Sequence, residues 1–266
     1  MSDEHAGLLE AVAEVARIAG TVALRHFKSN LTVETKSDGS PVTIADRAAE
    51  DAARSWIAAR FPRDGIEGEE RGTTLGVSGR RWILDPIDGT KAFVRGVPLW
   101  GSLIALCQEN DVIAGAASFP AVGEELVAAT GLGTWWNGAR CRVSSIASIG
   151  EATVVTTNPQ FRLTPDFKPR WDRLAAAAKV ARGWGDCYGY LLVATGRAEV
   201  MVDGSMADWD AAALYPIIVE AGGVFSDLAG RATPFGRSAI ATNAALAETA
   251  RALLEIPGAG VADSDK

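Results

Sequence analysis

Two aspartates that could bind a metal or take part in catalysis stand in the stretch Trp82-Ile83-Leu84-Asp85-Pro86-Ile87-Asp88-Gly89-Thr90. The apolar residues 82–84 predict a buried strand, and Pro86 predicts that this strand ends at Asp85. Carboxylates so spaced at the end of a strand can converge, and at neutral pH they repel each other unless a cation lies between them. The alternative is an ordinary Asp-Gly turn, which Gly89 would permit.

Two further acids stand where an extended piece ends or a helix begins. Glu70 ends a short extended piece, and the alternation of side chains along a strand predicts that Glu69 and Glu70 face opposite ways. Asp210 opens a predicted helix over 211–221. Carboxylate oxygens, together with the carbonyl oxygen of Ile87, are hard ligands that suit Mg²⁺ or Mn²⁺ rather than Zn²⁺.

This set of oxygen ligands predicts metal-assisted hydrolysis of a phosphate ester. Several carboxylates with few neutralising bases suit two or three cations, and cations about 3.5–4 Å apart can hold the attacking and leaving oxygens of a phosphoryl transfer. The backbone N–H groups of Gly89, Thr90 and Lys91 stand at a predicted helix start, where they could hold a phosphate.

The elements predicted around these residues include both helices and strands. Thr43 and Asp46 form a capping-box pattern that opens a helix through Arg60, so the local pattern alone makes Asp46 a helix cap. Residues 36–41 form a polar loop that we expect to be mobile. Periodicity predicts further helices over 8–23, 170–181, 184–196 and 244–256, and strands over 99–107, 112–118, 125–130, 134–136, 154–157, 198–202 and 238–242. Such segregated runs are typical of a layered α+β or α/β sandwich.

The composition argues against several classes of function. The 266 residues carry a net charge of −7 without a basic stripe, which argues against binding to nucleic acid. No apolar run approaches the length of a membrane span, and residues 1–5 lack the basic start of a signal peptide, so we expect a cytoplasmic protein. Three separated cysteines and two histidines predict neither a disulfide framework nor a zinc site nor a Ser-His-Asp triad.

Three motifs resemble the signatures of the inositol monophosphatase superfamily: Gly68-Glu69-Glu70, the stretch 82–90, and Trp209-Asp210-Ala211-Ala212 followed by 220–223. The resemblance implies the layered α-β-α-β-α sandwich of lithium-sensitive, magnesium-dependent phosphatases, which usually form homodimers. It also implies a single phosphatase domain over 1–257, with two intimate halves divided near 145–150, and a flexible tail over 258–266.

The resemblance further implies a set of metal ligands. A first Mg²⁺ would take Glu70, Asp85 and the carbonyl of Ile87. A second would take Asp85, Asp88 and Asp210, and Glu70 would share in a weaker third site. Mn²⁺ is the expected substitute for Mg²⁺.

Other residues acquire roles by the same resemblance. Thr90, oriented by Asp46, would position the attacking water and help to deprotonate it together with Glu70. This role of Asp46 can coexist with its role as a helix cap. Lys36 stands where the superfamily has a mobile loop over the metals.

Within the superfamily, the stretches 88–99, 184–196 and 241–243 resemble the histidinol-phosphatase branch. Typical inositol phosphatases tend to carry Thr-Asn after Gly-Thr, where this chain has Lys91. The resemblance implies hydrolysis of histidinol phosphate in histidine biosynthesis. The alternatives are the same chemistry on inositol monophosphate or another sugar phosphate, and a non-catalytic member of the fold that binds a partner protein.

Histidinol phosphate carries an amine and an imidazole, so its pocket needs hydrogen-bond acceptors. By resemblance, Asp203 would pair with the ammonium group, and Asp186 and Asn243 would meet the amine or the ring. Arg95 would contact the phosphate or a neighbouring subunit. Local pattern also allows an Asp-Gly turn at Asp203, an Asx cap at Asp186 and an exposed salt bridge at Arg95. Residues 203–208 depart from the branch, which tends to carry a proline after the first acid and Asn-Pro before Trp-Asp.

Overall fold

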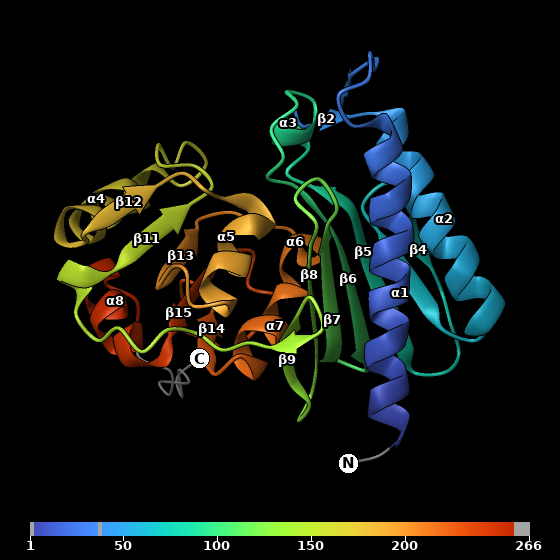
Figure 1. Cartoon of the computed structure of the whole chain (residues 1–266). Helices are drawn as coiled ribbons and strands as arrows, with labels where there is room; N and C mark the ends of the chain where they lie inside the picture. The colour runs from blue at the N-terminus through green and yellow to red at the C-terminus, as the bar shows by residue number, and fades with distance from the viewer. Residues whose placement is uncertain (1–2, 37–38, 258–266) are drawn as a thin grey trace, which may run out of the picture.

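The computed structural model of the chain describes residues 3–36 and 39–257. The predicted tail over 258–266 lies outside the described residues, as do residues 37–38 of the predicted mobile loop. Two β-sheets lie between layers of helices, and a further group of helices separates the two sheets (Figure 1).

Two long helices, α1 (Asp3–His26) and α2 (Ile44–Arg60), form one outer layer. α2 begins at the predicted capping box, because Thr43 Oγ1 accepts the N–H of Ala45 at 3.0 Å and Asp46 Oδ2 accepts the N–H of Thr43 at 2.8 Å. The buried faces of both helices are rich in alanine, which lets them pack closely against the sheet beneath.

The first sheet has the strand order β10-β9-β8-β7-β6-β5-β3-β4. β3 runs parallel to β5, and every other neighbouring pair in this sheet is antiparallel. Its strands are β3 (Gly65–Gly68), β4 (Gly72–Thr74), β5 (Arg80–Asp88), β6 (Gly101–Gln108), β7 (Asp111–Phe119), β8 (Glu124–Ala129), β9 (Gly133–Trp136) and β10 (Ala139–Arg140). A separate small hairpin pairs β1 (Glu34–Thr35) with β2 (Pro41–Val42).

The second sheet has the strand order β12-β11-β13-β15-β14. The chain reaches it through residues 141–152, and the predicted division near 145–150 falls within this connection. The strands are β11 (Thr153–Thr156), β12 (Val180–Arg182), β13 (Val200–Asp203), β14 (Gly223–Ser226) and β15 (Ala239–Asn243). The remaining helices are α3 (Thr90–Phe93), α4 (Lys168–Ala177), α5 (Asp186–Ala194), α6 (Asp208–Ala211), α7 (Leu214–Glu220) and α8 (Ala247–Leu254), with 3₁₀ turns at Ile149–Glu151, Pro165–Phe167 and Ala244–Leu246.

The alternation of side chains along the strands explains the five layers. In β5, Trp82 and Leu84 join the core beneath α1 and α2, whereas Ile83 joins the central core around α5 and α7. In β13, Met201 faces that same central core, and Val202 belongs to the core beneath α4 and α8. The predicted α-β-α-β-α sandwich is therefore confirmed, with both sheets buried on their two faces (Figure 1).

Neighbouring strands or a proline interrupt two of the predicted helices. The helix predicted over 170–181 ends at Ala177, because residues 180–182 pair in parallel with β11. The helix predicted over 211–221 is divided into α6 and α7. Pro216 lacks the N–H that a continuous helix would donate to the carbonyl of Ala212, and this explains the division.

Candidate active site

β5 continues through Pro86 to Asp88, so the predicted strand end at Asp85 is wrong. Asp85 lies opposite Leu103 of β6 and Asp88 opposite Gly101, which leaves one extra residue in β5 and marks a β-bulge. Pro86 is tolerated there because a bulge frees a residue from the ladder. In a regular strand the side chains of residues 85 and 88 would face opposite sides of the sheet, and the extra residue brings them to the same side.

Three carboxylates meet at this bulge. One oxygen of Asp85, one of Asp88 and one of Asp210, from α6, all lie within 4.8 Å of one another. Each carboxylate accepts one backbone N–H: that of Ile87 to Asp85 Oδ1 at 3.0 Å, that of Cys187 to Asp88 Oδ2 at 2.5 Å and that of Ala207 to Asp210 Oδ2 at 2.7 Å. The two halves of the chain therefore build the cluster jointly.

Burial and mutual repulsion disfavour ionisation of this cluster. Burial and the charges of Glu69, Asp88 and Asp210 raise the pKa of Asp85 well above its ordinary value. Burial, with Asp186 and Asp210, does the same to the pKa of Asp88. Burial, with the charge of Glu69 adding to it, raises the pKa of Asp210 to about 7. These hard oxygen donors, buried or half-buried and mutually repelling, fit a divalent cation.

Of the two adjacent glutamates, Glu69 contacts Asp85 of this cluster, and both bind Lys36. The Glu69 carboxyl shares a hydrogen bond with that of Asp85, although burial is the main cause of its raised pKa. The predicted opposite directions of Glu69 and Glu70 are wrong, because both carboxylates bind Lys36 Nζ, at 2.6 and 2.5 Å. β3 ends at Gly68, so the alternation of strand side chains does not extend into the turn that carries the two glutamates.

Thr90 and Asp46, the predicted water-positioning pair, each bond to another group in the structure. Thr90 Oγ1 donates to the carbonyl of Ile87 at 2.9 Å, so this hydroxyl lies beside an expected metal ligand. Asp46 Oδ2 accepts the N–H and, at 2.7 Å, the hydroxyl of Thr43. Burial raises the pKa of Asp46 to about 6, the bonds from Thr43 oppose this rise and the charge of Glu70 adds to it.

Gly89 makes the turn between the bulge and α3. Its φ of 85° lies in the left-handed region that glycine adopts without steric cost. A Cβ at this position would lie 3.1 Å from the carbonyl oxygen of Leu99 and 3.3 Å from Asp186 Oδ2, so glycine also permits a close approach. The first hydrogen bond of α3 runs from Ala92 to the Gly89 carbonyl, and the N–H groups before it belong to the unpaired end of the helix.

Asp186 and Asp203 form a second acidic pair beside the cluster. Asp203 Oδ1 accepts the N–H of Thr157 at 3.1 Å, and Oδ2 accepts the hydroxyl of Tyr190 at 3.1 Å. Burial raises the pKa of Asp203 to about 6. Burial and the charge of Asp203 raise the pKa of Asp186 to about 7, and the Lys91 ammonium opposes this rise.

Asp186 is the first residue of α5, and the N-cap position belongs to Gly185, so Asp186 is not the Asx cap that local pattern allowed. Its φ of 50° lies in the left-handed region, which aspartate tolerates better than most residues. The Asp186 N–H donates to Thr157 Oγ1 at 2.7 Å. Thr157 thus holds both members of the acidic pair.

Asn243 does not join this group, so the structure contradicts its predicted contact with the substrate. The residue is fully buried. Its Oδ1 caps a 3₁₀ turn by accepting the N–H of Leu246 at 2.9 Å. Its Nδ2 donates to Ser144 Oγ at 2.9 Å and to the Ile146 carbonyl at 2.8 Å. An amide with these bonds fastens the connection between the two sheets.

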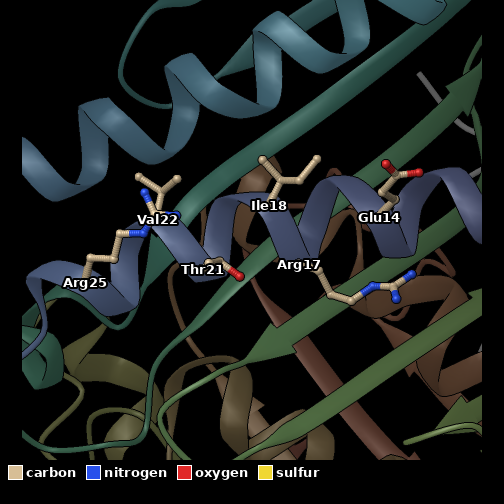
Figure 2. Close-up of a pocket in the computed structure, with 6 residues that line it drawn as sticks. All are labelled: Glu14, Arg17, Ile18, Thr21, Val22 and Arg25. Carbon is tan, nitrogen blue, oxygen red and sulfur yellow. The ribbon is translucent and has the colours of Figure 1, made fainter.

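Arg95 is exposed at the end of α3, where its guanidinium donates to the Lys91 carbonyl at 3.0 Å. Together with Lys91 it lines a groove of about 510 Å³ between α3 and the β1–β2 hairpin. A second groove, of about 310 Å³, runs along α1 (Figure 2). The second groove is lined by none of the residues that we expected in the active site.

The mixed α/β sandwich and the carboxylates at its centre are consistent with a phosphatase whose acidic cluster could hold a metal ion. The chain belongs to the inositol monophosphatase family, whose model matches residues 5–257. This match confirms the resemblance found in the motifs. Within the described ranges 3–36 and 39–257, no helix is long and apolar enough to span a membrane.

Relatives with curated names and solved structures agree with this assignment. The chain is 47% identical to a histidinol-phosphatase of Chlorobaculum parvum over 84% of this chain and 86% of that protein. It is 39% identical to a histidinol-phosphatase of Mycobacterium tuberculosis over 91% and 95%. Among solved structures, an inositol monophosphatase of Zymomonas mobilis is 31% identical, covers 96% of this chain and 100% of its own, and superposes with a TM-score of 0.83.

Proposed function

We propose that this chain is a Mg²⁺-dependent phosphomonoesterase that hydrolyses L-histidinol phosphate to L-histidinol and phosphate. One observation carries the proposal: the carboxylates of buried Asp85 and half-buried Asp88 and Asp210 lie beside a second acidic pair, Asp186 and Asp203. The first set suits metal-assisted phosphate chemistry, and the second suits a cationic substrate. The names of the two bacterial relatives support the same substrate.

Asp85, Asp88 and Asp210, with the Ile87 carbonyl, are the groups that would hold two or three Mg²⁺ ions, and Mn²⁺ is the expected substitute. We assign to Glu69 the metal-ligand role that was expected of Glu70, because Glu69 shares a hydrogen bond with Asp85. When bound, the cations lower the pKa of water and neutralise charge on the phosphoryl oxygens.

Other residues position the reactants. The Thr90 hydroxyl donates to the Ile87 carbonyl, and its oxygen would accept a hydrogen bond from the attacking water at the edge of the cluster. Asp46 lies near Glu70 on the same side and orients this region through Thr43. The N–H groups of Gly89 and Thr90, at the start of α3, would donate to the phosphoryl oxygens. No covalent intermediate on the protein is required.

The second acidic pair recognises the organic part of the substrate. The ammonium group of histidinol phosphate pairs with Asp186 or Asp203, and the other carboxylate accepts a hydrogen bond from the imidazole. Thr157 and Tyr190 hold the pair in position. Arg95, whose side chain is exposed, is proposed to contact the phosphate or a neighbouring subunit.

Phosphate release tests this proposal. The wild type should release phosphate from histidinol phosphate with Mg²⁺, and EDTA should stop the reaction. Asp203→Ala should lower kcat/KM for histidinol phosphate by about tenfold more than for a phosphate ester without a cationic group, such as glycerol 2-phosphate, since a paired charge is worth roughly 1.5–3 kcal/mol. Equal losses on both esters would remove Asp203 from recognition of the ammonium group.

A second candidate substrate is inositol 1-phosphate or another sugar phosphate, hydrolysed by the same chemistry. The observation that favours it is the 31% identity to an inositol monophosphatase of solved structure. Homodimer formation, lithium sensitivity, a cytoplasmic location and the lack of nucleic-acid or membrane partners stay predictions from the sequence. A non-catalytic partner-binding role stays the less favoured alternative, since the predicted carboxylates of the cluster are present.

A further inference from the structure

Glu50 is a buried carboxylate to which the mechanism above assigns no role. It lies on α2 and is fully buried. Its two oxygens accept three hydrogen bonds: from the N–H of Glu70 at 2.7 Å, from the N–H of Arg71 at 3.1 Å and from Arg54 Nε at 2.7 Å. Two of these donors belong to the turn between β3 and β4, immediately after Glu69.

Arg54, one helical turn further along α2, contacts the other side of the same turn. Its guanidinium pairs with Glu50 and also donates to the Gly72 carbonyl and, at 3.2 Å, to Thr74 Oγ1. Glu50 and Arg54 therefore hold both sides of the same turn, one by accepting and the other by donating. The ion pair satisfies the charge that Glu50 brings into the interior.

The backbone around the turn leaves little freedom. A Cβ on Gly68 would overlap the Glu50 carboxylate, so this approach requires glycine. The N–H of Glu69 donates to the Leu84 carbonyl at 3.2 Å, directly before Asp85 in β5. Glu69 is thus fixed on one side by β5 and on the other by Glu50.

We infer that Glu50 is a positioning residue: its carboxylate, balanced by Arg54, fixes the turn that brings Glu69 to the acidic cluster and so sets the affinity of that cluster for divalent cations. This inference rests on the proposed metal site. A purely structural Glu50 would tie α2 to the sheet and affect stability alone.

Glu50→Gln is the most informative change. Glutamine keeps the size of the side chain but replaces one acceptor oxygen by an NH₂ group. In one orientation the NH₂ faces the N–H of Glu70, and in the other it faces Arg54 and the N–H of Arg71, so each orientation sets donor against donor. The turn between β3 and β4 is then no longer held in one position.

Asp51→Asn is the matched control. Asp51 is the next residue of α2 and binds the same turn, but through the exposed guanidinium of Arg71, at 2.9 and 2.6 Å. It does not touch the backbone of the turn in any hydrogen bond found among the described residues. The control therefore removes a carboxylate near the turn without releasing Glu69.

The test measures Mn²⁺ binding to the full chain without substrate, by the electron paramagnetic resonance signal of free Mn²⁺, together with the Tm of the metal-free protein. Glu50→Gln should weaken Mn²⁺ binding by about tenfold, the scale of a lost hydrogen bond to a charged acceptor. Asp51→Asn should change the Kd by less than about twofold, as for an exposed ion pair.

An unchanged Mn²⁺ affinity with a lower Tm in Glu50→Gln would overturn the inference and leave Glu50 a structural residue. If Glu50→Gln does not fold, Arg54→Gln decides: weaker Mn²⁺ binding supports the inference, and unchanged binding overturns it. A wild type that binds no Mn²⁺ would instead refute the proposed metal site, so the two failures are distinguishable.

Discussion

Adjacent glutamates in this chain have different surroundings. Both bind Lys36, but Glu69 also shares a hydrogen bond with Asp85 in the cluster, whereas the charge of Glu70 acts on Asp46. The sequence shows only two neighbouring acids after Gly68, and the choice between them depends on the turn geometry that Glu50 imposes. A motif match could name the pair, but the contacts were needed to separate its members.

Exchanging each glutamate for glutamine tests this division. Glu69→Gln should raise the Mg²⁺ concentration needed for half-maximal phosphate release by about 10–100-fold, the range found when groups that support a metal site are removed. Glu70→Gln should raise it less, because the Asp85 carboxyl bonds to Glu69 and not to Glu70. A larger effect in Glu70→Gln would restore the original assignment.

Asp88→Asn should abolish turnover without unfolding the protein. The amide keeps the volume of the side chain but removes a charge from the cluster, and phosphoryl transfer then loses several kcal/mol of stabilisation, which corresponds to a fall of roughly a thousandfold or more in kcat. Circular dichroism should show an intact fold. Near-normal activity would remove Asp88 from the metal site.

The raised pKa of Asp186 predicts a pH-dependent effect on stability. Its folded pKa of about 7 lies above an unfolded value of about 4, so the folded state binds the proton more tightly. The destabilisation caused by Asp186 therefore grows as the pH rises from about 4 to about 7 and is constant above that range. Asparagine also tolerates the left-handed backbone at this position.

In EDTA, the Tm of Asp186→Asn relative to the wild type should accordingly increase between pH 5 and pH 7 and then level off. Thermal unfolding at several pH values measures this difference. The same difference at every pH would show that Asp186 does not titrate as the structure indicates.

At the scale of elements, the decisive feature is the bulge in β5. The sequence predicted a strand and a turn at Pro86, but not that the strand continues to Asp88 with an extra residue. Hydrophobic pattern identifies the buried face of a strand and carries no direct signal for an irregular register. The capping box of α2, by contrast, is encoded by neighbouring residues and was predicted correctly.

Ser102→Ala tests the importance of the bulge. Ser102 is buried, and its hydroxyl donates to the Pro86 carbonyl at 2.6 Å. Removing this donor leaves a buried carbonyl without its partner, so the free energy of unfolding should fall by about 1–3 kcal/mol. Urea denaturation measures this change. An unaltered free energy of unfolding would mean that the bulge does not depend on Ser102.

At the scale of the whole molecule, the site lies where the two halves of the chain meet. Asp85 and Asp88 come from the first sheet, and Asp210, Asp186 and Asp203 come from the segments around the second. The backbone of Cys187 in α5 binds Asp88 directly, so the position of a cluster residue in one half depends on a helix in the other.

The layered sandwich could be predicted from motifs that span the chain, but the strand orders could not. β5 pairs with β3 and β6, and β13 lies between β11 and β15. Such long-range neighbours leave no local signal in the sequence. Asn243 shows the cost of relying on a motif alone, because its side chain is used entirely in fastening the connection between the sheets.

The central claim is that the acidic cluster and the neighbouring acidic pair form a phosphatase site for a cationic ester. The most direct measurement compares kcat/KM for histidinol phosphate and inositol 1-phosphate, side by side, with Mg²⁺. We predict a strong preference for histidinol phosphate. A preference for inositol 1-phosphate would contradict the assigned substrate, and no Mg²⁺-dependent release from either ester would contradict the claim itself.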